Sequence, residues 1–352
     1  MIAGRDDLID RYIDAIDIEL AGLGNPVLDT VFVGGGTPTH LPPKQLSRFL
    51  AIISDRCQLA DGCEWSAEAN PEDIRTDVID LLAEHGLNRI SLGVQSFNQS
   101  KLLMLERSHD KSRAIDAIET AGNRIPNVSI DLIFAAPGET VDEWETDLAI
   151  AHSLPIQHLS TYALTFEKGT SFWSRRKRGE LCATTEDIEV QMYQASRAAC
   201  AANGFVQYEI SNFAKSESRC RHNLAYWSGQ GWYAVGPGAA RFVNGQREVN
   251  HRSTTTYLKM VSATGDATAE RDSISLTQYA RERAAFGIRM LCGIDIAQLS
   301  LETGVQIADE CRDAIDRCQH NGLIDQDDDR LMLTERGIIF ADTVASEFLG
   351  DE

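Results

Sequence analysis

"TVFVGGGTPTHL", residues 30–41, is an apolar strand that runs directly into three glycines. Val31, Phe32 and Val33 are typical of a buried strand, and Gly34–Gly36 form a backbone that a ligand can approach closely because it carries no Cβ atoms. A Walker A loop would need a Lys-Ser/Thr pair after its glycines, and a dinucleotide-binding loop would space them as GxGxxG. Neither pattern is present, so the stretch predicts a loop that binds something other than a nucleotide phosphate.

Strand-like runs alternate with amphipathic segments through the first half of the chain. The expected strands are LDTVFV, EWSAEA, RISLGV, VSIDLIFA and HLSTYAL, at residues 28–33, 64–69, 89–94, 128–135 and 158–164. Repeated β-loop-α units indicate a parallel sheet, either open or curled into a barrel. Polar residues gather just after these strands, at the edge where parallel α/β folds bind ligands. We therefore expect a binding site at that edge.

The pattern changes after about residue 170. A basic segment, FWSRRKRGE, precedes a helix expected from Thr185 to Ala202, and the last part of the chain predicts a short hairpin with a helix behind it. This patterning is that of a winged helix, although its Asp-rich hairpin, Asp325–Asp329, would repel DNA. The expected domains are an α/β barrel over 1–170, an α+β extension over 171–275 and a winged-helix-like module over 276–352.

Composition excludes several classes of protein. A formal net charge of −20 over 352 residues argues against a nucleic-acid binder, which needs a cationic surface. No apolar run is long enough to span a bilayer and no secretory leader opens the chain, so a cytoplasmic location is expected. The eight cysteines are expected to be thiols rather than disulfides, and none shows zinc-ribbon or cluster spacing. Cys311 and Cys318 are expected on one helix, packed in the core.

Four motifs in series resemble those of the radical S-adenosylmethionine (SAM) enzymes. They are GGGTPT, SAEANP at 66–71, SLGVQSF at 91–97 and DLIFAAPGET at 131–140. More narrowly, they are similar to the branch that contains oxygen-independent coproporphyrinogen III oxidases and HemW-type heme chaperones. YEISNFA at 208–214 and HNLAYW at 222–227 favour the chaperones. The resemblance covers nearly the whole chain and implies an incomplete (β/α)6-type partial barrel followed by a C-terminal α+β region.

The resemblance implies a SAM site. The candidate residues are Gly34, Gly35, Gly36, Thr37, Glu68, Gln95, Arg107 and Asp131. In the family, the glycine-rich strand end binds the SAM ammonium, and Glu68 matches an acid near the methionine. Arg107 matches the arginine that pairs with the carboxylate, and Gln95 and Asp131 match residues that bind the ribose hydroxyls. Taken singly, each has a plainer interpretation as a tight turn, a loop cap, a backbone hydrogen bond or a surface ion pair. Their order at successive strand ends favours the SAM site.

Radical SAM chemistry also needs a [4Fe-4S] cluster, bound by three cysteines in a CxxxCxxC run. The chain opens with MIAGRDDLIDRY, which in the family follows the last of these cysteines, so the expected cluster ligands are not in this sequence. Cys57 and Cys63 do not replace them by spacing. Three explanations are weighed: a start codon further upstream, a trimmed chain, or loss of the cluster. The retained SAM residues favour the first two, and the strand at 28–33 is expected at an open sheet edge.

A heme site is the second implication of the resemblance. The motif HNxxYW gives His222, Asn223, Tyr226 and Trp227, with His222 as the candidate iron ligand. A neutral imidazole is a common axial ligand of heme iron, and aromatic neighbours offer a flat apolar surface to the porphyrin. The plainer interpretation of His222 is a half-buried, hydrogen-bonded side chain. Val235–Ala239 is expected to form a tight turn, and Trp232 and Tyr233 are expected to be packing residues.

Three functions follow from these implications. The favoured one is a heme chaperone that delivers heme to respiratory proteins, with SAM, heme and a family-type cluster as cofactors. The alternative is an oxygen-independent coproporphyrinogen III oxidase, which would need an intact cluster and a longer N-terminal arm. The third is a scaffold that has lost both activities. The expected partners are heme-acceptor proteins and not nucleic acid, and a peripheral contact with a membrane is compatible with that role.

Overall fold

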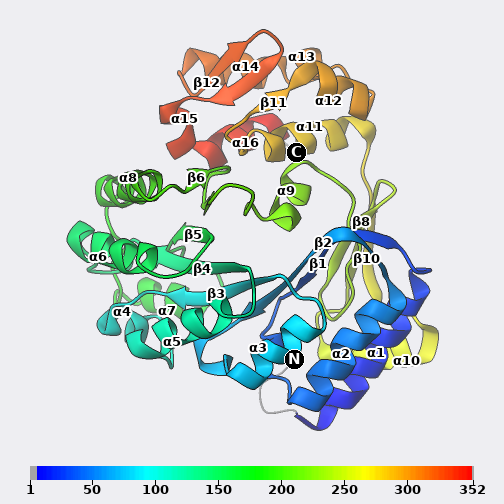
Figure 1. Ribbon diagram of the computed structural model, residues 1–352. Coiled ribbons are helices and arrows are strands. Elements are labelled where there is room, and N and C mark those ends of the chain that lie inside the picture. Colours follow the sequence, from blue (N-terminus) through cyan, green and yellow to red (C-terminus); the bar gives the residue numbers. More distant parts are fainter. Residues whose placement is uncertain (1–5, 351–352) are drawn as a thin grey trace. The chain divides into compact units, whose positions relative to one another are not determined.

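The computed structural model describes residues 6–350, which form two compact units (Figure 1). The first, here called the barrel unit, holds residues 32–40 and 64–220. The second, the three-segment unit, holds the described residues of 1–31, 41–63 and 221–352. The three domains expected from the sequence remain a proposal.

A seven-stranded sheet has the strand order β1-β2-β3-β4-β5-β7-β6. The strands are β1 (Val27–Val33), β2 (Gln58–Ala69), β3 (Arg89–Gln95), β4 (Asn127–Phe134), β5 (His158–Ala163), β6 (Val206–Gln207) and β7 (Asn212–Ala214). From β2 to β5 neighbouring strands are parallel, whereas β7 is antiparallel to both β5 and β6. All five expected strands are confirmed, and β1 lies at one end of the strand order, as expected.

Burial alternates along the strands of the barrel unit. Ile90 and Leu92 of β3 are fully buried, whereas Ser91 and Gln95 on the same strand are partly accessible, as is Asp131 on β4. Helices α5 and α8 pack against this sheet, which explains the apolar positions. The helices of this unit are α3 (Thr76–Glu84), α4 (Gln99–Met104), α5 (Lys111–Gly122), α6 (Val141–His152), α7 (Ser171–Lys177) and α8 (Glu186–Ala202), with short 3-10 turns at Pro38–His40 and Pro71–Asp73. The accessible polar positions therefore share the face that these helices do not cover.

A polar network fills the N-terminal end of the parallel strands. Arg89, 3% exposed, places its Nε 2.9 Å from a carboxylate oxygen of Glu64. The hydroxyls of Ser129 and Tyr208 lie 2.7 and 2.8 Å from the two ring nitrogens of His158. Burial, and then the nearby charge of Arg89, lower the pKa of His158 to about 3, so the ring is neutral. The polar groups of this network hydrogen-bond to one another. The candidate ligand-binding residues lie at the opposite, C-terminal ends of the strands.

A buried glutamate joins distant parts of the three-segment unit. Glu19 of α1 is 5% exposed and accepts hydrogen bonds from the backbone of Gly236 at 2.8 Å, from Asn250 at 2.6 Å and from the Tyr257 hydroxyl at 2.6 Å. The backbone N–H of Ala239 donates to Gly236, and Gly236 has φ of 109°, so the expected tight turn at Val235–Ala239 is confirmed. The elements here are a 3-10 turn at Asp6–Leu8, α1 (Ile9–Gly22), α2 (Pro43–Arg56), α9 (Arg221–Trp227), β8 (Ala240–Val243), β9 (Gln246–Asn250), α10 (Thr254–Thr264) and β10 (Thr268–Ser273).

The last part of the three-segment unit contains the expected hairpin. β12 and β13 are antiparallel, with Ile324 opposite Leu333. The elements are α11 (Leu276–Gly287), β11 (Ile294–Asp295), α12 (Ile296–Thr303), α13 (Ile307–Glu310), α14 (Arg312–His320), β12 (Ile324–Asp327), β13 (Arg330–Leu333), α15 (Glu335–Ile339) and α16 (Ala341–Leu349). Cys311 and Cys318 are both buried in its core, as expected. They do not share one helix, however, because Cys311 lies at the break between α13 and α14.

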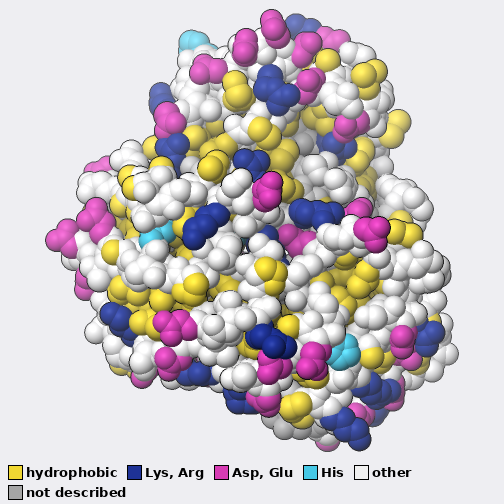
Figure 2. Space-filling model, in the orientation of Figure 1, with side chains coloured by type: hydrophobic (Ala, Val, Ile, Leu, Met, Phe, Trp, Pro, Cys, Tyr) yellow, Lys and Arg dark blue, Asp and Glu magenta, His cyan; other side chains and the backbone are white. Residues whose placement is uncertain are grey.

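Charges of both signs are mixed on one face of the surface. On the face shown in Figure 2, acidic side chains lie among lysines and arginines. No helix among the described residues combines the length and apolar character that a membrane crossing requires.

Candidate functional site

The glycines after β1 contact the acidic residue near the end of β2. The backbone N–H of Gly35 donates to Oε2 of Glu68 at 3.1 Å. A Cβ on Gly34 would lie 2.8 Å from Cδ of Glu68 and would also meet the ring of Phe32, so only glycine fits there. Gly35 has φ of 71°, and no atom lies within 4 Å of its Cβ position. The close approach at Gly34 is thus made by the chain's own side chains, while Gly35 and Gly36 are exposed.

Two carboxylates lie near one another at the strand ends. Glu68 is paired in register with Ser91, whose hydroxyl donates to the Asp131 carboxylate at 3.2 Å. Burial raises the pKa of Glu68, with a further contribution from the charge of Asp131. Burial also raises the pKa of Asp131 to about 6, against the opposing hydrogen bonds from Ser160 and Ser91. No described lysine or arginine contributes to either shift, so the pair forms a place where a cationic ligand would be stabilised.

Thr37 and Gln95 complete the group of strand-end residues. Asn70 donates to the Thr37 hydroxyl at 2.9 Å. Nε2 of Gln95 lies 3.1 Å from the position that a Cβ of Gly93 would take, and Oδ1 of Asn70 lies 3.6 Å from the same point. Asn70 and Gly93 were not singled out from the sequence; Asn70 lies in the SAEANP motif and Gly93 in SLGVQSF.

Three non-glycine residues in the barrel unit have left-handed backbone conformations close to candidate residues. They are Gln95 with φ of 66°, Glu106 with φ of 58° and Ala135 with φ of 60°. Gln95 ends β3, Ala135 follows β4 directly, and Glu106 precedes the candidate Arg107. Such conformations cost about 1–3 kcal/mol and cluster at functional sites. Their positions indicate that this rim is shaped for binding.

Arg107 differs from the other candidates. It is half-buried and follows α4, and its side chain forms no ion pair or hydrogen bond with any residue that the structure describes. The surface ion pair of the plainer interpretation is therefore not seen within residues 6–350. A partly buried guanidinium in this state suits a ligand carboxylate. No described hydrogen bond joins Arg107 to the glycines, Glu68 or Asp131.

Helix α9 carries the HNxxYW motif in the three-segment unit. Nδ1 of His222 lies 3.0 Å from the hydroxyl of Thr30, and Nε2 lies 3.1 Å from the hydroxyl of Tyr226. His222 and Tyr226 are one helical turn apart and their rings meet edge to face at 4.9 Å. Asn223 is half-buried on the same helix. Thr30, on β1, was not predicted from the sequence.

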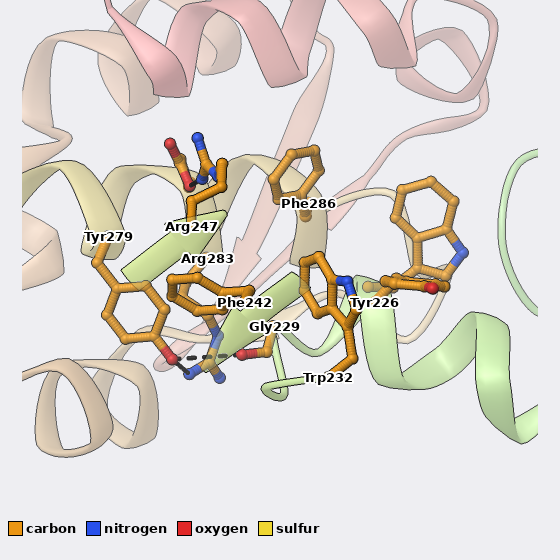
Figure 3. Close-up of a pocket in the computed structure, with 10 residues that line it drawn as sticks. Tyr226, Gly229, Trp232, Phe242, Arg247, Tyr279, Arg283 and Phe286 are labelled. Atoms are coloured by element: carbon orange, nitrogen blue, oxygen red, sulfur yellow. Dashed lines mark hydrogen bonds and ion pairs between the residues drawn. The ribbon is translucent and has the colours of Figure 1, made fainter. Parts of the chain in front are cut away.

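An apolar pocket of about 180 Å³ lies beside this motif (Figure 3). It is lined by Tyr226, Trp227, Gly229, Trp232, Phe242, Arg247, Tyr279, Glu282, Arg283 and Phe286. Ring centres are 4.8 Å apart from Tyr226 to Trp232, 5.6 Å from Trp232 to Phe242 and 5.7 Å from Phe242 to Tyr279. Trp232, expected to be a packing residue, therefore also lines a cavity. In Figure 3 the ring of Phe242 lies between those of Trp232 and Tyr279.

The charged residues at the pocket are paired within the chain. Arg247 lies 2.5 Å from Glu282, and Arg283 lies 2.6 Å from Glu302. The hydroxyl of Tyr279 donates to the backbone oxygen of Gly229 at 3.3 Å. Gly229 has φ of 64°, which favours glycine, and a Cβ there would also displace the side chain of Arg283.

Two buried donors near the pocket lack acceptors in the described part of the chain. They are Nε1 of Trp227 and Nε of Arg289, whose guanidinium lies 5.1 Å from the Trp227 ring centre. Buried donors normally have partners, and such exceptions indicate a site for water or a ligand oxygen.

No metal centre is formed by the residues that the structure describes. Within them, no three His, Cys, Asp or Glu side chains are arranged to hold a metal ion. The eight cysteines are thiols, and Cys182 and Cys292 are the two exposed ones. Residues 6–350 therefore offer no ligand set that fits a [4Fe-4S] cluster.

The arrangement of the strand ends and the order of the motifs define a radical SAM scaffold. The sequence pattern of the Radical SAM superfamily matches residues 4–150, and that of the HemN C-terminal domain matches residues 274–340. The fold is that of coproporphyrinogen III oxidase (HemN) from Escherichia coli, a radical SAM enzyme. The TM-score is 0.87 at 20% identity, over 99% of this chain and 85% of that chain. At that identity the likeness shows the fold alone.

Closer relatives by sequence are heme chaperones. Heme chaperone HemW of Bacillus subtilis is 31% identical over 349 residues, 97% of this chain and 92% of the relative. Heme chaperone HemW of Mycobacterium tuberculosis is 34% identical over 346 residues, 97% of this chain and 87% of the relative. The chain therefore belongs to the heme chaperone HemW family.

Proposed function

We propose that this chain is a heme chaperone, which binds heme at α9 and passes it to an acceptor protein. The observation that carries the proposal is the position of His222, Tyr226 and Trp227 beside an aromatic pocket within one compact unit. The name that the relatives share, heme chaperone, supports it. For the oxidase alternative there are a shared fold and a match to the HemN C-terminal domain at residues 274–340, whereas the relatives that are more than 30% identical carry the chaperone name.

The local chemistry suits a heme iron. A histidine that binds a metal through one ring nitrogen commonly uses the other for an orienting hydrogen bond. Thr30 would fill that role at Nδ1, which leaves Nε2 for the iron. The Tyr226 hydroxyl now lies on Nε2, so it must move aside before the iron can bind. The buried N–H of Trp227 would then have a heme carboxylate as its acceptor.

Titration with hemin tests this proposal. The Soret band should shift and saturate at one heme per chain, and His222→Ala should weaken the affinity while the protein remains folded. His320→Ala, an exposed histidine at the end of α14, is the matched control and should bind as the parent does. Failure of the parent chain to bind hemin, or equal affinity in the His222→Ala variant, would overturn the assignment.

We also propose that the barrel unit binds SAM through the strand-end residues. Gly35, Glu68 and Asp131 are connected by hydrogen bonding and charge, and the two raised carboxyl pKa values suit the cationic groups of SAM. Arg107 would receive the SAM carboxylate. In the family the cluster supplies reductive cleavage of SAM, but the described residues do not fit it, so no cleavage is assigned to them.

The proposed heme acceptors are respiratory proteins. Transfer is measured by mixing the hemin-loaded chain with an apo-cytochrome and following the acceptor spectrum. A chaperone should transfer heme faster than free hemin binds at the same concentration, and an unchanged rate would argue against delivery.

A further inference from the structure

We infer that the aromatic pocket beside α9 takes the apolar edge of the porphyrin and thereby selects heme over porphyrins that carry carboxylates on every side. This inference rests on the proposed heme-binding function. It assigns a role to Trp232, Phe242, Tyr279 and Phe286, which lie outside the HNxxYW motif.

The size of the pocket points to one edge of a macrocycle. Its volume is about 180 Å³, whereas pockets that bury a whole drug-sized ligand hold roughly 300 Å³ or more. A complete tetrapyrrole therefore does not fit, but one side of the ring with its substituents does. The pocket is continuous with the motif because Tyr226 and Trp227 belong to its wall.

The lining fits an apolar edge. Tyr226, Trp232, Phe242 and Tyr279 follow one another with ring centres 4.8 to 5.7 Å apart, so most of the wall is aromatic carbon. Phe286 of α11 also lines the pocket, and its side chain is 42% exposed (Figure 3). The vinyl and methyl groups of heme would gain from leaving water here.

The charges of the pocket argue against a carboxylate in it. Both arginines of the lining are already paired, Arg247 with Glu282 and Arg283 with Glu302. A propionate placed among the rings would meet Glu282, the one carboxylate of the lining, and two arginines that already form ion pairs. The indole N–H of Trp227 has no acceptor in the described part of the chain; Nε of Arg289 also has none, although this guanidinium pairs with Asp342 through another nitrogen. Heme has propionates on one side only and can satisfy both regions, whereas coproporphyrin carries four and must bury some of them.

The experiment compares three porphyrin ligands on the parent chain and two matched variants. Iron(III) protoporphyrin IX and iron(III) coproporphyrin III are titrated into the full chain, and metal-free protoporphyrin IX is followed by its fluorescence. Phe286→Ala removes a pocket ring, and Phe340→Ala removes a ring of similar exposure, 42% against 45%, that does not line the pocket. Thermal unfolding confirms that both variants are folded.

The parent chain should bind the protoporphyrin about tenfold or more tightly than the coproporphyrin. Phe286→Ala should weaken both protoporphyrins about tenfold and reduce the discrimination, while Phe340→Ala changes neither. The metal-free ligand makes the pocket contribution visible without iron ligation. Unchanged selectivity in Phe286→Ala, with hemin binding still lowered in His222→Ala, would overturn this inference and leave the proposed function standing. Absence of hemin binding in the parent would overturn both.

Discussion

Replacement of Asp131 by asparagine is expected to stabilise the ligand-free protein at neutral pH. The amide keeps an acceptor for the Ser91 hydroxyl, which donates to this side chain at 3.2 Å. What it removes is the cost of ionising a desolvated carboxyl, whose pKa is raised from 3.8 to about 6. A raised pKa means that the folded state holds the proton more tightly than the unfolded state. The stability contribution of Asp131 is therefore complete below pH 4 and is lost as the pH rises through 6.

The size of the effect follows from the shift. A pKa difference of about two units, at about 1.4 kcal/mol each, gives an upper limit of about 3 kcal/mol for the loss above pH 7. Because Asp131 is partly accessible, solvent screening reduces this, and we expect on the order of 1–3 kcal/mol. The gain in Asp131→Asn should shrink toward zero near pH 4.

Urea unfolding at several pH values between 4 and 7.5 measures this difference. Asp147→Asn is the control, because Asp147 is 2% exposed, accepts from the backbone of Phe97 at 2.9 Å and lies 3.3 Å from Lys101. Loss of the Asp147 charge in this variant should destabilise the protein. An Asp131→Asn variant that is less stable than the parent at neutral pH would refute the reasoning and show that the hydrogen bonds from Ser91 and Ser160 to the carboxylate outweigh the cost of burying it.

Three further substitutions test other parts of the two sites. Arg107→Ala should weaken the affinity for SAM, measured by equilibrium dialysis, about tenfold or more. The control Arg124→Ala changes a half-exposed arginine beside Asp80 and should leave the affinity unchanged. Equal losses in the two variants would show that Arg107 is not part of the site. Gly34→Ala should cost about 1–3 kcal/mol in chemical denaturation, because its Cβ would lie 2.8 Å from Glu68, and a stable variant would contradict the packing. Thr30→Val should lower hemin affinity about tenfold by releasing Nδ1 of His222, and Thr30→Ser should restore it; full affinity in the valine variant would deny the orienting role.

The strands of the barrel were predictable because each contains a short run rich in buried apolar residues. Parallel strands of this kind appear in the sequence as nearly continuous apolar runs, and β3 begins at the expected residue. β2 begins six residues before the expected Glu64, because its first half, QLADGC, is mostly polar and exposed. Its extended form comes from pairing with neighbouring strands, which a local pattern does not record. The short strands β6 and β7 were missed for the same reason.

The strand-end group was predictable because parallel strands bring their carboxyl ends to one edge, but the heme site was predictable only where its residues follow one another in the chain. His222 and Tyr226 lie one helical turn apart, so the motif and the contact coincide. Thr30, the partner at Nδ1, lies 192 positions earlier. Phe242 and Phe286 come from β8 and α11 and line the same pocket as Trp232 only because of tertiary packing. The spacing of these residues in the sequence therefore does not predict the pocket. From the sequence, the glycine at position 34 is attributed to the close approach of a ligand. In the structure, the groups nearest to a Cβ at this position are the side chains of Phe32 and Glu68.

The buried Glu19 has a consequence for synthesis on the ribosome. Its partner Tyr257 is 238 positions further along the chain, so this hydrogen bond cannot form until Tyr257 has been synthesised. At about 5–20 residues per second, the interval between synthesis of Glu19 and of Tyr257 is roughly 10–50 seconds. The barrel unit ends at residue 220 and can be completed within this interval, when α1 can already pack on α2 but not yet on α10. The nascent chain therefore presents a folded barrel unit while the contacts of α1 with α10 and of Glu19 with Tyr257 are still missing.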